Sequence, residues 1–131
     1  IDVPPDVAPS MIDEFPVFFV AASMAQGRTS TSGLDELRVK ESDRLTLMAL
    51  GLKAIGAKVE EREDGLIIDG SGGEPLEGNA TVTSALDHRI AMSFAVAGQN
   101  VYHAIHVDDV SPIATSFPTF ESILQNLQVQ N

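Results

Sequence analysis

The chain has 131 residues and a formal net charge of −11, because 19 Asp and Glu residues outnumber 8 Lys and Arg residues. This length allows one ordinary domain or two small packed units, and 44% hydrophobic residues are typical of globular rather than disordered proteins. So acidic a chain repels polyanions, which argues against nucleic acid and membranes as partners, and the absence of cysteine excludes disulfides and thiolate chemistry.

The chain begins with Ile1 and a proline-rich lead over residues 1–9, which is typical of a segment cut from a longer protein. The lead carries acids and prolines where a secretion signal carries basic residues and leucines. No apolar run reaches the ~18 residues that a membrane span needs. We therefore expect a cytoplasmic protein.

The first elements predicted are a buried helix and a short strand. Residues 12–26 predict the helix, because Ser10 and Asp13 have the spacing of a helix start and the following segment is dense in Phe, Val and Ala. Gly27 ends this helix. Residues 28–33 predict the strand, since Thr and Ser dominate there.

An amphipathic helix is predicted next, from Ser42, which we expect to cap it, to Gly56. Steps of three, four and three residues place four apolar side chains on one face, and this is the stripe expected to be buried. Its members are Leu45, Met48, Leu52 and Ile55.

A β-hairpin and a loop follow that helix. Residues 57–61 and 66–69 predict the hairpin strands, because Asp64 and Gly65 between them favour the positive φ angles of a tight turn. Residues 70–80 predict a loop on glycine and proline content alone, and this loop marks the boundary between two units.

The second half of the chain partly repeats the order of the first. Its predicted elements are a helix over 88–97 that is closed by Gly98, a strand over 101–107 and a helix over 116–127. The repetition indicates an α/β architecture of two units, residues 1–72 and residues 73–131, with parallel strand pairs expected inside each.

The few basic residues of the chain are clustered. Arg38, Lys40 and Arg44 fall within seven positions, and one explanation is that they neutralise neighbouring acids on a solvated surface. However, Arg44 and Arg89 each fall in the first turn of a predicted helix, where the macrodipole disfavours a cation. An arginine and free backbone N–H groups together bind phosphate or carboxylate, so two such sites facing each other would suit a ligand with both groups.

Several titratable side chains lie beside these cations in the sequence. Glu41 follows a lysine and is either a proton-transfer group or a charge-balancing loop residue. Spacing alone favours structural roles for Asp13, as the partner of a Ser10 cap, and for Asp87, as an N-cap. His88 is an acid, an anion donor or an ordinary helix-terminal histidine, and spacing does not separate these.

Other motifs argue against metal, nucleotide and nucleophilic chemistry. His103 and His106 have an odd separation in a strand, so their side chains point to opposite faces and do not share a metal ion. Residues 70–73 are glycine-rich but lack the Lys-Ser/Thr pair of a nucleotide loop, which makes them a linker. Ser42 and Ser116 are interpreted as caps rather than nucleophiles.

Four segments together closely resemble the closing portion of 5-enolpyruvylshikimate-3-phosphate (EPSP) synthases, nearest to the bacterial class II group, which is often glyphosate tolerant. They include the strings Arg-Val-Lys-Glu-Ser-Asp-Arg and Asp-His-Arg-Ile-Ala-Met, and they cover residues 10–16, 33–45, 86–94 and 113–118. The resemblance runs over essentially the whole chain. It implies a fold of repeated βαβαββ units, of which two are present here, the second incomplete.

The resemblance also implies an activity: transfer of the enolpyruvyl group of phosphoenolpyruvate (PEP) to the 5-hydroxyl of shikimate 3-phosphate, with release of phosphate and no cofactor. It implies that Asp13 contacts the shikimate hydroxyls and accepts a proton, which replaces the capping role favoured by spacing. It implies that Glu41 handles protons at the PEP methylene. The PEP phosphate and carboxylate would be held by Lys40, Arg44 and Arg89, with His88 lining the same site.

One position departs from part of the family, because some synthases have a lysine where Thr115 stands. The family's first domain and the opening unit of its second domain lie outside this chain. We therefore expect the polypeptide alone to lack turnover, to bind PEP weakly and to self-associate through an uncovered apolar face. The alternatives are a non-catalytic anion-binding or assembly module of the same fold, and the related transferase that acts on UDP-N-acetylglucosamine, which is not associated with these strings.

Overall fold

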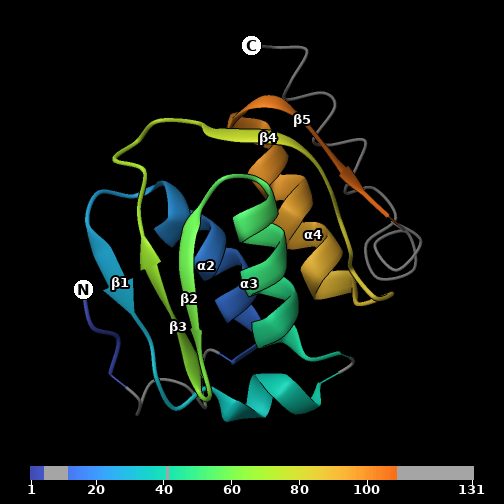
Figure 1. Ribbon diagram of the computed structural model, residues 1–131. Helices are drawn as coiled ribbons and strands as arrows, with labels where there is room; N and C mark the ends of the chain where they lie inside the picture. The colour runs from blue at the N-terminus through green and yellow to red at the C-terminus, as the bar shows by residue number, and fades with distance from the viewer. Residues whose placement is uncertain (5–11, 41, 109–131) are drawn as a thin grey trace.

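The structure, a computed structural model, describes residues 1–4, 12–40 and 42–108 (Figure 1). The predicted helix over 116–127 lies outside this range. Within it no helix is both long and apolar enough to cross a membrane. The helices and strands are, in chain order, α2 (Phe15–Met24), β1 (Arg28–Ser30), α3 (Arg44–Ala54), β2 (Lys58–Arg62), β3 (Gly65–Asp69), β4 (Leu76–Val82), α4 (His88–Ala97) and β5 (Val101–Val107).

The strands form two sheets. β1, β3 and β2 make a three-stranded sheet in that order, with both pairs antiparallel, and β4 pairs with β5 in parallel. The predicted parallel pairing is confirmed for β4 and β5, and the predicted hairpin is confirmed by the antiparallel pair of β2 and β3. The parallel pair expected in the first unit is wrong for β1, which pairs antiparallel with β3. The reason is that β3, the returning strand of the hairpin, inserts between β1 and β2. An isolated parallel bridge joins Asp2 to Ser30 beside β1.

The hairpin forms where it was predicted, but its turn lies one residue earlier. Arg62 pairs with Gly65, so Glu63 and Asp64 make the turn, and neither Asp64 nor Gly65 has a positive φ angle. Gly65 is instead required by a close approach, because a Cβ atom there would collide with the backbone carbonyl of Thr31.

The prediction of a loop over residues 70–80 is wrong in its second half, where β4 begins at Leu76. Buried and exposed positions largely alternate along β4, as they do in a half-buried strand. The glycine content of this segment suggested a loop, but Gly78 is required within the strand. It has a φ angle of 72°, and a Cβ atom there would collide with the carbonyl of His103.

Residues 70–73 are not a free linker, because they close the C-terminal end of α2. The backbone N–H groups of Ser71 and Gly73 donate to the carbonyl oxygens of Ser23 and Met24, at 3.0 and 2.8 Å. These carbonyls have no partner inside the helix, so the glycine-rich segment supplies the hydrogen bonds that the helix end lacks.

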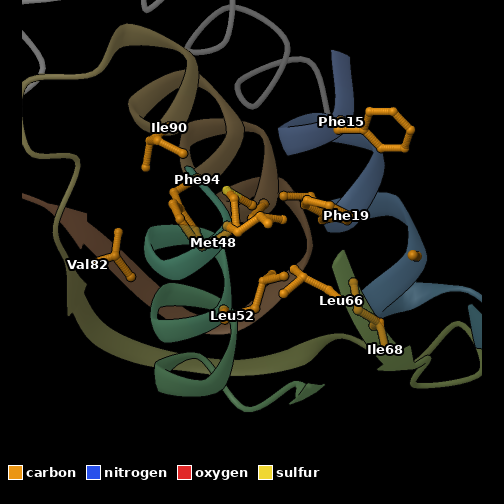
Figure 2. Close-up of a cluster of buried hydrophobic side chains, with 14 of the residues drawn as sticks. Phe15, Phe19, Met48, Leu52, Leu66, Ile68, Val82, Ile90 and Phe94 are labelled. Carbon is orange, nitrogen blue, oxygen red and sulfur yellow. The ribbon is translucent and has the colours of Figure 1, made fainter. Parts of the chain in front are cut away.

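The helices pack against one another and against β3 around one continuous core (Figure 2). The predicted apolar stripe of α3 is confirmed, since all four of its members are fully buried. Gly51 of α3 lies directly against the ring of Phe94, and any Cβ atom at residue 51 would collide with that ring. Helices α3 and α4 therefore approach closely, which helps to bring their first residues together.

Candidate active site

Helices α2, α3 and α4 run in the same direction, and all three begin at the lower end of the molecule in Figure 1. Asp13 lies just before α2, Arg44 is the first residue of α3, and Arg89 is the second residue of α4. Helix starts carry free N–H groups and the positive end of the macrodipole. This end of the molecule is therefore suited to bind anions.

Arg44 contacts two carboxylates at this end of the molecule. Its side chain is only 2% exposed, and its Nε lies 2.8 Å from Oδ2 of Asp87. Its Nη2 lies 3.3 Å from Oδ1 of the same carboxylate, and its Nη1 lies 3.2 Å from Oδ1 of Asp13. The guanidinium thus makes a bidentate ion pair with the Asp87 carboxylate, and its remaining nitrogen, Nη1, contacts the Asp13 carboxylate.

Asp87 caps α4, as predicted, by accepting a hydrogen bond of 3.0 Å from the backbone N–H of Arg89. It is also fully buried and accepts a hydrogen bond of 2.7 Å from Oγ of Ser42. Burial raises the pKa of Asp87, but the hydrogen bonds from Arg44, Ser42 and Arg89 and the charge of Arg44 outweigh it. The pKa therefore lies below its ordinary value of 3.8.

The ion pair of Asp87 with Arg44 was missed from the sequence. Spacing identifies a cap, but it does not reveal that the cap is buried against an arginine 43 positions away. The available signal was the arginine itself, because a cation in the first turn of a helix needs a nearby carboxylate to offset the macrodipole.

A strained turn places Asp87. The residues before it, Ala85 and Leu86, have φ angles of 50° and 61°. For residues other than glycine this conformation costs about 1–3 kcal/mol each. The turn closes with a 2.8 Å hydrogen bond from the Asp87 N–H to the Ser84 carbonyl. Ser84 is held in turn by the carboxylate of Asp108, which accepts from its N–H at 2.9 Å and from its hydroxyl at 3.0 Å.

Lys40 and Arg89 border Asp13 from two further directions. Nζ of Lys40 lies 3.9 Å from Oδ1 of Asp13 and 3.9 Å from Oε2 of Glu36. Nη1 of Arg89 lies 3.5 Å from the backbone carbonyl oxygen of Asp13. His88, half-buried, is the first residue of α4. The structure therefore brings Asp13 together with three predicted cations that come from two other segments.

Arg38 belongs to the same sequence cluster but has a structural role. It donates to the carbonyl oxygens of Arg62 and Glu63, both at 2.7 Å, and its Nη1 lies 3.0 Å from the carboxylate of Asp43. The explanation by charge neutralisation therefore holds for this residue, which fastens the hairpin turn to the start of α3.

The prediction that Ser42 caps α3 is wrong. Asp43 is the cap, because its carboxylate lies next to the first helical residue and accepts from the N–H of Thr46 at 3.2 Å. The Ser42 hydroxyl donates to Asp87 instead. Some predicted residues lie outside the described part of the chain: Ser10, Glu41, Thr115 and Ser116.

A pocket of about 380 Å³ opens between α2 and α4, beside these charges. Asp13 and Arg89 lie in its wall, and Val17, Phe18 and Met92 supply apolar surface. The pocket therefore combines a carboxylate and a guanidinium with a largely apolar lining, an arrangement typical of small-molecule sites.

Among the described residues, no group of three or more His, Asp or Glu side chains is placed to hold a metal ion. His103 and His106 are both exposed on β5, and Nε2 of His103 lies 3.7 Å from Oε1 of Glu77.

Comparisons with known proteins identify the family of this chain. The family model of EPSP synthase (3-phosphoshikimate 1-carboxyvinyltransferase) matches residues 4–124. The chain is 67% identical over 128 residues to the 3-phosphoshikimate 1-carboxyvinyltransferase of Sphingopyxis alaskensis, covering 98% of this chain and 29% of that protein. It is 61% identical over 129 residues to the enzyme of the same name from Novosphingobium aromaticivorans, covering 96% and 29%.

Solved structures give the same result for the fold. The EPSP synthase of Acinetobacter baumannii superposes with a TM-score of 0.90 at 46% identity, over 96% of this chain and 29% of that one. The predicted α/β fold and the predicted family are thus both confirmed, and the chain spans less than a third of the length of these relatives. The chain belongs to the EPSP synthase family.

Proposed function

We propose that this chain forms part of the active site of a 3-phosphoshikimate 1-carboxyvinyltransferase. The reaction transfers the enolpyruvyl group of PEP to the 5-hydroxyl of shikimate 3-phosphate and releases phosphate, without a cofactor. Two kinds of observation support the proposal: the printed names of relatives up to 67% identical, and the geometry at the start of the three helices.

The convergence of Arg44 and Arg89 on Asp13 carries this proposal. PEP bears a carboxylate and a phosphate within a small molecule, and partly desolvated guanidinium and ammonium groups are the side chains that bind such an anion most strongly. Lys40, Arg44 and Arg89 are proposed to hold these two groups, and His88 to line the same site.

The chemistry requires a proton acceptor and a proton donor on opposite reactants. Asp13 is proposed to take the proton from the 5-hydroxyl of shikimate 3-phosphate as that oxygen bonds to C2 of PEP. Glu41 is proposed to give a proton to the PEP methylene carbon in the same addition. Return of a proton from the new methyl group to Glu41 restores the double bond as the phosphate departs, and the phosphate takes up the proton held by Asp13, so both carboxylates are regenerated and the reaction balances.

The test uses the full-length Sphingopyxis alaskensis relative with its matching segment replaced by these 131 residues. We expect the chimera to release phosphate only when both substrates are present. Glu41→Gln should abolish turnover while PEP binding, measured by calorimetry, is kept. Glu60→Gln, an exposed carboxylate on β2, is the matched control and should leave both unchanged. A chimera that binds PEP but never turns over would instead favour the non-catalytic anion-binding module.

The polypeptide of 131 residues by itself is proposed to lack turnover and to bind PEP weakly, since it spans 29% of its relatives. Phosphate release by the isolated chain at a normal enzyme rate would contradict this. Exposed apolar side chains such as Val39 and Leu86, which are 78% and 65% exposed, support self-association of the isolated chain. A clean monomer in sedimentation at high concentration would contradict that.

The division of the chain into units and the location of the parent protein are also proposals. The chain is proposed to consist of two repeat units, residues 1–72 and 73–131. The parent protein is proposed to be cytoplasmic, as the sequence predicts. Cell fractionation with an antibody to this chain tests that location.

A further inference from the structure

We infer, on the basis of the function proposed above, that Asp87 is a positioning residue for PEP binding. It fixes the direction of the Arg44 guanidinium and joins the start of α3 to the start of α4. It does so without touching the substrate, because its side chain is fully buried behind Arg44 and Ser42.

The first reason is the saturation of the Asp87 carboxylate. Oδ2 accepts from Nε of Arg44 at 2.8 Å and from Oγ of Ser42 at 2.7 Å. Oδ1 accepts from Nη2 of Arg44 at 3.3 Å and from the Arg89 N–H at 3.0 Å. Four donors from two helix starts therefore converge on one carboxylate, and they leave it no position for a ligand.

The second reason is the direction that this pair imposes on Arg44. Because Nε and Nη2 both face Asp87, the planar guanidinium is held in one orientation and Nη1 is turned toward Asp13. The Asp13 side chain is 46% exposed, whereas Arg44 is 2% exposed. Nη1 therefore points toward Asp13, which lines the pocket between α2 and α4, and we place the arriving substrate anion beside this carboxylate.

The third reason is the link to Arg89. Asp87 caps α4 through the Arg89 N–H, so the same carboxylate sets both the first turn of α4 and the side chain at the first turn of α3. The strained turn at Ala85 and Leu86 holds the Asp87 backbone in place. Such strain persists where the surroundings enforce one geometry.

The chain contains a matched control for this arrangement. Asp43 also caps a helix, α3, and also makes an ion pair with an arginine, Arg38, at 3.0 Å. Arg38, however, donates to backbone carbonyls of the hairpin and not to the candidate site. Asp43→Asn therefore removes the same chemistry as Asp87→Asn, but away from the proposed substrate.

The experiment measures steady-state kinetics of the chimera with each variant. Asp87→Asn should raise the KM for PEP by about 10- to 100-fold, because the supporting partner of a binding group is lost. The KM for shikimate 3-phosphate should stay within about twofold, since the two residues that Asp87 fixes, Arg44 and Arg89, are proposed to hold PEP and not that substrate. Asp43→Asn keeps a good helix cap and loses only the partly exposed ion pair with Arg38, so it should lower the thermal midpoint slightly and leave the KM for PEP within about twofold.

A merely structural role for Asp87 gives a different pattern. In that case Asp87→Asn would lower the thermal midpoint and leave the KM for PEP unchanged, which would overturn the inference. An equal rise in both KM values would overturn it as well.

If Asp87→Asn does not fold, Ser42→Ala provides the second test, because it removes one of the four donors and keeps the ion pair. This variant should raise the KM for PEP by a few-fold, and an unchanged KM would overturn the inference. An unmodified chimera without turnover would overturn the proposed function, and the inference with it. An active chimera that is insensitive to both variants would overturn the inference alone.

Discussion

Two arginine–aspartate pairs in this chain have the same geometry and opposite surroundings. In the pairs Arg28–Asp69 and Arg44–Asp87 the arginine Nε lies 2.8 Å from a carboxylate oxygen. The first pair is 68% and 44% exposed, whereas the second is 2% and 0% exposed. Water and salt weaken the first pair, so contact distance alone does not show which pair matters.

The same division extends to all eight basic residues. Four line a shallow hollow of about 640 Å³ beside the three-stranded sheet, here called the sheet hollow: Arg28, Lys53, Lys58 and Arg62. The other four lie at or beside the start of α3 and α4: Arg38, Lys40, Arg44 and Arg89. Only the second group combines burial, helix starts and a nearby pocket, which is why the smaller cavity, and not the larger hollow, is assigned the chemistry.

Replacing Arg44 should cause the largest loss of stability, far above the loss caused by replacing Arg28. Arg44→Met leaves the Asp87 carboxylate buried without its counter-ion, so the free energy of unfolding should fall by about 3–5 kcal/mol. PEP binding should be lost as well. Urea unfolding of the chain and calorimetry on the chimera measure the two effects. A stability loss no larger than that of Arg28→Met would contradict the division.

Lowering the pH should reveal how much the charge of Asp87 contributes to the stability of the fold. Because the folded-state pKa of Asp87 lies below 3.8, its ionised form stabilises the fold above that pH, and the stabilisation is lost as the pH falls through the folded-state pKa. Asp87→Asn should therefore be less stable than the native chain at neutral pH, with the gap closing in strong acid. Urea unfolding across this pH range measures the gap, and a constant gap would show that the charge of Asp87 does not contribute.

Replacing Arg89 removes a cation from the candidate site, and replacing Lys53 removes one from the sheet hollow. Arg89→Met should raise the KM for PEP in the chimera by about 10- to 100-fold, the expected loss for a hydrogen bond to a charged ligand. Lys53→Met removes a cation from the sheet hollow and should leave the KM unchanged. Equal effects of the two changes would mean that general positive charge, and not the site, attracts PEP.

Arg28→Met should have the smallest effect. Its partner Asp69 has a pKa below the ordinary value because Arg28 donates a hydrogen bond to it, yet both side chains are well exposed. The unfolding midpoint of this variant should match that of the native chain at moderate salt, where exposed pairs are screened. A clear loss that persists in high salt would require a role for the sheet face that its exposure does not predict.

Much of the fold could be predicted because residues close by in the sequence mark where its helices and strands begin and end. Helix α4 and strand β5 have the predicted bounds, since Gly98 closes the helix and apolar side chains recur at alternate positions along the strand. The misplaced loop over 70–80 shows the opposite case. There the glycine that suggests a loop is required by the close approach of β5, a contact that only the folded chain contains.

The candidate site also has features that the sequence predicts and features that it does not. Arg44 and Arg89 could be paired from the sequence because both are cations at helix starts, where a cation is unfavourable without a partner or a ligand. The contact between Asp13 and Arg44 spans 31 positions and was not predicted, although the family resemblance placed both residues in one active site. The burial of Asp87 depends on how α3 packs against α4, so no spacing rule could identify it as the carboxylate that joins them.

A crystal structure of the chimera with PEP tests the central claim most directly. We predict one PEP molecule whose oxygen atoms lie within about 3.2 Å of the guanidinium groups of both Arg44 and Arg89, with Asp87 still paired behind Arg44. PEP bound over the sheet hollow, or in contact with only one of these two arginines, would contradict it.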